Sequence, residues 1–137
     1  MNAVDILFRT RRFNLSKVGE HFINPCCFGE DLADWLRLRL EERNVVADDP
    51  NQEDWGWGLP VTNGRDSYYL GVSGNADPSG TNADEGEWRI IVQKRRSIWQ
   101  RLAGKGHIVA GDELVGLIEH ILCNQSGITN VHRAASE

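Results

Sequence analysis

Apolar and polar residues alternate along several stretches of this chain, as they do in strands that bury one face. The most uneven stretch has Trp55 and Trp57 on one face and Gly56 and Gly58 on the other. We predict a strand over Trp55–Thr62, with a tryptophan side that faces the core and a nearly bare opposite side. The pattern leaves open what fills the space over the two glycines.

The same alternation predicts four further extended segments, which cover residues 4–16, Ser67–Ser73, Glu87–Arg95 and Ile128–His132. Asn63-Gly64 is a strong signal for a two-residue hairpin turn between two of the predicted strands. Val45-Val46 begins another strand or a connection, and the residues after it, 48–52, have the composition of a turn. Residues 74–86 are polar and rich in Gly, Asn and Asp, which is typical of a surface loop.

Two segments repeat apolar residues with the period of a helix. The first is predicted from about Glu30 to Asn44, with a buried face formed by Leu32, Ala33, Leu36 and Leu40. The second begins after Asp112, a good N-cap residue, and stops near Gly127. Its apolar face consists of Leu114, Val115, Leu117, Ile118, Ile121 and Leu122. A short helical turn is predicted over Ser97–Leu102.

The order of these elements predicts a fold of the α+β class. We expect a two-layer sandwich in which a mainly antiparallel sheet of four to six strands carries two helices on one face, a ferredoxin-like variant. Residues 1–137 are expected to form a single domain, because the length is ordinary for one domain and no repeat or linker divides the chain. Both helices have one apolar face, so they should cover the same side of the sheet and leave the other side open.

Composition bears on location. The sequence contains no run of about 18 apolar residues, and its basic N-terminal region lacks the apolar segment of a signal peptide. Three cysteines are an odd number, which argues against a disulfide framework. We therefore expect a cytoplasmic protein that does not associate with a membrane.

The net charge of −5 hides a segregation of charges along the chain. Residues 45–87 carry nine acidic residues and only one basic residue, Arg65, whereas residues 88–111 carry six basic residues and no acidic one. The two blocks could complement each other across adjacent strands, or the basic block could bind an anionic partner. The overall acidity argues against nucleic-acid binding.

The open sheet face is the first candidate site. Glycines in a strand often mark a close approach of another backbone or a ligand. The residues expected to bind a ligand or partner there are Gly56, Gly58, Tyr69, Arg89, Gln93 and Arg95. Alternatively, the Tyr69 ring could lie across Gly56 or Gly58 as a structural compensation, or a second copy of the chain could cover the face.

Other candidate sites have weaker patterns. His21 with Cys26 and Cys27 could form a nucleophile and base, but adjacent cysteines do not have redox or zinc spacing. Glu119, His120 and Cys123 share a helix face, but one helix supplies too few metal ligands. The loop over residues 75–86 fits a calcium loop poorly. We predict no catalytic set, no metal and no cofactor.

Glu53 and Asp54 precede the tryptophan strand, and Arg39 and Arg43 lie near the end of the preceding helix. A pairing of these acids with Arg39 or Arg43, for example of Glu53 with Arg39, would fix the helix end to the sheet.

Two motifs are similar to those of a family of small bacterial α+β proteins. They are Gly29-Glu30-Asp31-Leu32-Ala33-Asp34-Trp35-Leu36, which matches G-x-D-L-A-x-W-L, and Glu53-Asp54-Trp55-Gly56-Trp57. The resemblance covers about the first half of the chain and implies no catalytic residue. In size and charge the chain also resembles the immunity proteins that neutralise bacterial toxins.

These patterns together favour a protein that acts by binding, without chemistry of its own. The expected partner is another protein or a second copy of the chain in a homodimer. The alternative is a small-molecule-binding protein or weak enzyme that uses the open sheet face or the His21/Cys26 loop.

Overall fold

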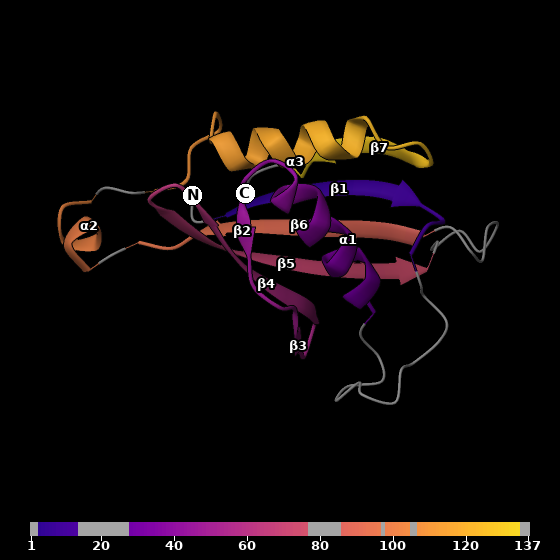
Figure 1. Cartoon of the computed structure of the whole chain (residues 1–137), viewed down its shortest axis with the longest axis horizontal. Coiled ribbons are helices and arrows are strands. Elements are labelled where there is room, and N and C mark those ends of the chain that lie inside the picture. Colours follow the sequence, from indigo (N-terminus) through magenta and orange to yellow (C-terminus); the bar gives the residue numbers. More distant parts are fainter. Residues whose placement is uncertain (1–2, 14–27, 77–85, 97, 105–106, 135–137) are drawn as a thin grey trace.

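Within the residues that the structure describes, which are 3–13, 28–76, 86–96, 98–104 and 107–134, seven strands form one sheet accompanied by three helices (Figure 1). The structure is a computed structural model. In chain order the elements are β1 (Ala3–Thr10), α1 (Glu30–Glu41), β2 (Val46–Ala47), β3 (Asn51–Glu53), β4 (Gly56–Asn63), β5 (Asp66–Ala76), β6 (Gly86–Lys94), α2 (Ile98–Leu102), α3 (Glu113–Cys123) and β7 (Ile128–Arg133).

The strands lie in the order β2-β4-β5-β6-β1-β7, and β3 pairs with β4 on the same edge as β2. Every pairing is antiparallel, which confirms the mainly antiparallel sheet expected from the sequence. The expected number of four to six strands is too low. Residues 48–52 were expected to form a turn, but β3 begins at Asn51. The sequence did not reveal β2 and β3 as separate strands, because strands of two or three residues are too short to show alternation.

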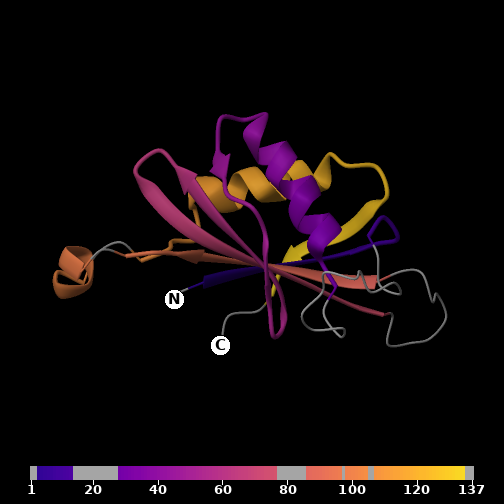
Figure 2. The same ribbon diagram turned by 60° about the horizontal axis from the view of Figure 1, so that its bottom comes forward.

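α1 and α3 lie on the same side of the sheet, and α2 lies beyond the end of β6, away from both (Figure 2). The face of the sheet opposite α1 and α3 is called the open face below. Among the described residues, no helix is long and apolar enough to cross a membrane.

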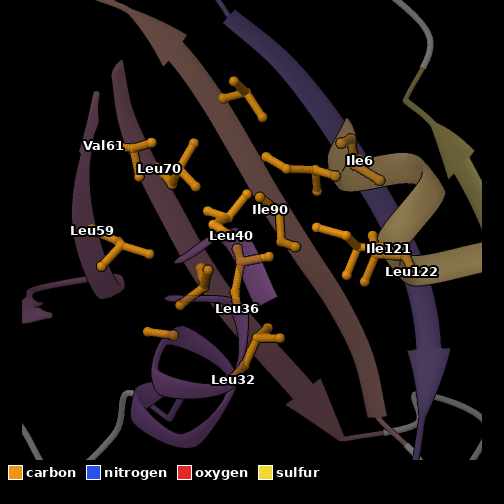
Figure 3. Close-up of a cluster of buried hydrophobic side chains, with 14 of the residues drawn as sticks. Ile6, Leu32, Leu36, Leu40, Leu59, Val61, Leu70, Ile90, Ile121 and Leu122 are labelled. Carbon is orange, nitrogen blue, oxygen red and sulfur yellow. The ribbon is translucent and has the colours of Figure 1, made fainter. Parts of the chain in front are cut away.

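The core lies between the sheet and the two long helices (Figure 3). Leu36 and Leu40 of α1 and Leu122 of α3 are fully buried there against Leu70 and Ile90 of the sheet. The apolar faces predicted for both helices are buried, except that Leu117 is only partly so. Burial of apolar surface at roughly 25 cal/mol per Å² makes this layer the main source of stability.

Trp55 does not belong to the strand predicted for it. β3 folds back on β4, with Glu53 opposite Gly56, so Asp54 and Trp55 form the two-residue turn between the strands. The alternation of β4 therefore begins at Gly56, and Trp57 alone of the two tryptophans is buried in the core. The prediction that both tryptophans share one face is wrong, because it did not include the β3–β4 hairpin.

The Glu53–Arg39 pair expected from the sequence does not form. Arg39 instead pairs with Glu42 at 2.7 Å, within the last turn of α1. α1 ends at Glu41, three residues before the predicted end. Asn44 has a positive φ of 64°, and the Val45 N–H donates to the Leu40 carbonyl, which turns the chain out of the helix.

Asp112 is the N-cap of α3, as predicted. Its Oδ1 accepts hydrogen bonds from the Leu114 and Val115 N–H groups at 2.9 and 3.2 Å. Its Oδ2 accepts a third from the Tyr68 hydroxyl at 2.9 Å. The buried carboxylate therefore ties the start of α3 to β5.

Several predicted boundaries shift by a few residues. β1 ends at Thr10, and residues 14–16 of the predicted segment lie outside the described residues. Asn63 pairs with Asp66, so the hairpin residues are Gly64 and Arg65, and Gly64 has a φ of 64°. This φ suits the first position of a type I′ turn and favours glycine.

Candidate functional site

The space over the glycines of the open face is filled by two aromatic side chains from the chain itself. A Cβ at Gly58 would collide with the Tyr69 ring. A Cβ at Gly71 would lie 2.6 Å from the Trp55 indole. Both aromatic side chains therefore cover the bare backbone of β4 and β5, as in aromatic compensation for exposed glycine.

Gly56 has a different neighbour. A Cβ there would meet the backbone carbonyl of Val72 and the side chain of Ser73. The glycine therefore permits a close approach of two backbone segments at the turn between β3 and β4.

Apolar side chains continue across the open face from Trp55. Leu7 of β1 and Ile91 of β6 are half-buried on this side, whereas their neighbours in sequence belong to the core face. Ile91 lies opposite Gly71, the glycine that Trp55 covers. Trp55 itself remains 46% exposed. The centre of the open face thus presents Trp55, Ile91 and Leu7 to solvent.

Charged residues surround this apolar centre in pairs. Arg89 lies 3.7 Å from Asp5 across β6 and β1, and Arg9 pairs with Glu87 at 2.9 Å. A third pair, Lys94 with Asp66 at 3.6 Å, joins the basic and acidic blocks across β6 and β5, as one of the two sequence interpretations expected. Exposed pairs of this kind contribute about 0–1 kcal/mol each, so they define the rim more than they stabilise the sheet.

A basic cavity lies where the open face meets the segment leading to α2. It has a volume of about 490 Å³ and is lined by Glu53, Tyr69, Gln93, Lys94, Arg95, Arg96 and Arg101. An adjoining cavity of about 200 Å³ is lined only by Gln93, Lys94, Arg96 and Arg101. We call the two together the basic cavity.

Tyr69 connects the basic cavity to the glycine-rich strands. Its hydroxyl donates a 2.6 Å hydrogen bond to the Glu53 carboxylate, and the Arg95 guanidinium lies 5.4 Å from the centre of its ring. This distance is within the range of a cation–π interaction. Burial, together with the bond to Glu53, raises the pKa of Tyr69 to about 12, although Arg95 lowers it. The hydroxyl is therefore a hydrogen-bond donor at neutral pH.

The structure brings together three of the six residues predicted to bind a ligand or partner. Tyr69, Gln93 and Arg95 line the basic cavity. Arg89 lies farther along β6 and pairs with Asp5, and Gly58 lies beneath the Tyr69 ring. Gly56 packs against β5.

The sequence did not single out Lys94, Arg96, Arg101 or Trp55 as site residues. The first three belong to the basic block of residues 88–111, and that block was the available signal. The sequence could not show which basic residues of this block lie together, because only the path of the chain after β6 brings Arg101 to the same cavity as Lys94. Trp55 was assigned to the core by its position in the alternation.

Exposed apolar residues gather on α2 beside the basic cavity. Ile98, Trp99 and Leu102 are 72%, 80% and 76% exposed. Their spacing of i, i+1 and i+4 places them on one side of the helix. This side contacts no part of the core cluster.

The weaker sequence candidates have no support in the geometry. His21, Cys26 and Cys27 lie outside the described residues, as does most of the proposed calcium loop, residues 77–85. Glu119 accepts two hydrogen bonds from Arg133, at 2.9 and 2.8 Å, and these bonds lower its pKa. In the described part of the chain, no group of three or more His, Cys, Asp or Glu residues could hold a metal ion.

A further cavity of about 380 Å³ is lined by Thr10, Arg11, Arg12, Gly127 and Thr129, none of which is a predicted site residue.

Comparison of the chain with protein-family models, with curated proteins and with solved structures found no match in any of the three.

Proposed function

We propose that this protein acts by binding a protein partner through the open face, without chemistry of its own. The partner is another protein or a second copy of this chain. The observation that carries the proposal is the apolar centre formed by Trp55, Ile91 and Leu7, on a sheet face that no helix of the described residues covers.

The side chains of this centre suit an interface. Trp, Tyr and Arg are the residues that most often dominate binding energy at protein interfaces. Trp55 and Tyr69 are held in place by the glycines beneath them, so ordering them on binding costs little conformational entropy. The paired charges of Arg89 with Asp5 supply a polar rim.

The test compares the wild type with Ile91→Glu. This substitution places a charge in the centre of the open face, opposite Gly71. We expect it to weaken partner binding or self-association at least about tenfold. Sedimentation velocity over a wide concentration range measures self-association. Affinity capture, followed by titration of the purified captured protein, measures binding of another partner.

Leu38→Glu is the matched control, because Leu38 is 49% exposed on α1, on the helix side of the sheet. It should leave binding unchanged. Two results together would overturn the proposal: the wild type is strictly monomeric, and every protein that it captures is also captured by Ile91→Glu.

The finer architectural description is also a proposal. A two-layer, ferredoxin-like variant is supported by α1 and α3, which lie on one side of the sheet (Figure 2), and by β1, an interior strand between β6 and β7. The antiparallel pairing of β1 with β6 departs from the split β-α-β motif. A cytoplasmic location is proposed from the odd number of cysteines, of which Cys123 is free and exposed.

A second candidate function is the binding of a small molecule. The basic cavity favours it, because the cavity joins Tyr69, Gln93 and Arg95.

A further inference from the structure

We propose that the basic cavity binds a phosphoryl group, carried either by a small soluble phosphate compound or by a phospholipid headgroup. The basic residues that carry this proposal lie beside α2 and are not part of the apolar centre of the open face, so it stands independently of the protein-binding role; Tyr69 borders both surfaces.

The charge of the lining is the first argument. Four basic residues, Lys94, Arg95, Arg96 and Arg101, line the cavity together with one acidic residue, Glu53. The Glu53 carboxylate accepts the hydrogen bond of Tyr69. The Lys94 ammonium pairs with Asp66 at 3.6 Å and lies 6.0 Å from the centre of the Tyr68 ring. The cavity therefore has an excess of positive charge that suits a ligand with more than one negative charge.

The donor geometry is the second argument. The smaller part of the cavity is lined by two arginines, one lysine and one glutamine, which are Arg96, Arg101, Lys94 and Gln93. Guanidinium groups bind the oxygens of phosphate in a bidentate way, and lysine adds a compact point charge. A phosphoryl group has enough anionic oxygens for several of these donors, whereas a single carboxylate has two.

The orientation of the lining is the third argument. Arg95 is held over the Tyr69 ring, which itself lies on Gly58. Arg96, which follows β6, donates a hydrogen bond from its Nη2 to the Gln100 carbonyl of α2 at 3.4 Å. No carboxylate of the described residues forms an ion pair with Arg95 or Arg101. Both cations are therefore available to a ligand.

The neighbouring α2 offers a way to tell the two sources of phosphate apart. α2 lies at one end of the molecule (Figure 1), its residues Ile98, Trp99 and Leu102 are exposed, and its Arg101 lines the cavity. Apolar and aromatic residues next to arginines are also found where proteins enter the surface of an anionic bilayer. A soluble phosphate compound needs none of these three side chains, so their substitution separates the two sources.

The experiment uses the full chain and three probes: inorganic phosphate, pyrophosphate, and phosphatidylcholine vesicles with or without phosphatidic acid. Soluble probes are titrated by calorimetry and by amide chemical shifts, and vesicle binding is measured by co-sedimentation. The test variant is Arg96→Gln with Arg101→Gln. The control is Arg43→Gln with Arg65→Gln, which removes the same charge from two exposed arginines outside the cavity.

The wild type should bind pyrophosphate or the phosphatidic acid vesicles, with shifts centred on residues 93–101. The test variant should weaken that binding at least about tenfold, and the control should change it less than about twofold. If Ile98→Ser with Trp99→Ser abolishes vesicle binding and the soluble probes do not bind, the phosphate comes from a lipid. If the soluble probes bind and this variant leaves them unchanged, it comes from a soluble compound.

Two results would overturn the proposal. One is that none of the probes binds the wild type. The other is that the control weakens binding as much as the test variant does, because the attraction would then be a property of net charge. Amide spectra of each variant verify that it is folded, and Arg101→Glu, at an exposed position, serves as a single-substitution substitute for the test variant.

Discussion

On the open face, aromatic side chains pack over strand glycines, and the missing side chains of the glycines leave the space that the rings occupy. Tyr69 rests on Gly58, and Trp55 rests on Gly71. The sequence predicted that Tyr69 lies across one of the strand glycines, because glycine in a strand exposes backbone that an aromatic ring can cover. It could not predict Trp55, whose position depends on the β3–β4 hairpin.

Substitution of Gly58 tests this packing. Gly58→Ala should lower the free energy of unfolding by about 1–3 kcal/mol, because the added methyl group displaces the Tyr69 ring. The loss should shrink in the Tyr69→Ala background, which removes the ring. Urea denaturation of both single variants and the double variant gives the coupling.

Gly116→Ala provides the comparison for the same chemical change. A Cβ at Gly116 of α3 meets nothing within 4 Å, and alanine is the better helix former by about 1 kcal/mol. This variant should be more stable than the wild type. Additive effects of Gly58→Ala and Tyr69→Ala would show that the ring and the glycine do not interact.

The raised pKa of Tyr69 predicts a loss of stability at alkaline pH. Between pH 10 and about pH 12 the unfolded chain releases the phenolic proton, whereas the native protein retains it in the bond to Glu53. The free energy of unfolding should therefore fall as pH rises, by about 1–2 kcal/mol over this range.

Tyr69→Phe isolates this effect, since it keeps the ring and removes the titrating group. The pKa of Tyr68 is also raised, by burial and by its bond to Asp112, and that contribution is present in both proteins. Urea denaturation at several pH values measures the difference. Parallel pH profiles for the wild type and Tyr69→Phe would contradict the assignment.

At the scale of elements, α3 illustrates what a local pattern can predict. Its apolar period, its N-cap and its approximate end were all evident from the sequence, because a helix is closed by hydrogen bonds within one segment. The hydrogen-bond partner of the Asp112 cap was not evident from the sequence. Tyr68 lies 44 positions earlier, and only the packing of α3 over the sheet brings its hydroxyl to Asp112.

Asp112→Ala should lower the free energy of unfolding by about 2–4 kcal/mol. The substitution removes the cap of α3 and leaves the buried Tyr68 hydroxyl without its acceptor. Asp112→Asn retains one side-chain oxygen and should lose less. The midpoint and slope of urea denaturation give both values. An Asp112→Ala variant as stable as the wild type would mean that water replaces the carboxylate.

At the scale of the whole molecule, the two sides of the sheet have separate roles. One side and the two long helices enclose the core, and the other side carries the apolar centre and joins the basic cavity. The charge segregation seen in the sequence has a spatial counterpart. Cations from the end of β6 and from α2 converge, while acidic residues of the preceding block pair with single cations, as Glu87 does with Arg9.

The sequence by itself determined the α+β class, the antiparallel pairing, the apolar faces of both long helices and the cap at Asp112. These features depend on periodicity and on groups a few residues apart, so they are legible along the chain. Three of the predicted binding residues, Tyr69, Gln93 and Arg95, also converge, because strand parity places alternate side chains on one face.

Only the tertiary structure decided the rest: that Trp55 lies on the open face, that Arg39 pairs with Glu42, and that Arg101 joins the cations of β6. The first depends on the short β3–β4 hairpin, the second on a choice between competing acidic partners, and the third on the path of the irregular segment after β6. None of these has a period in the sequence, because contacts between distant residues are selected by the packing of the whole chain.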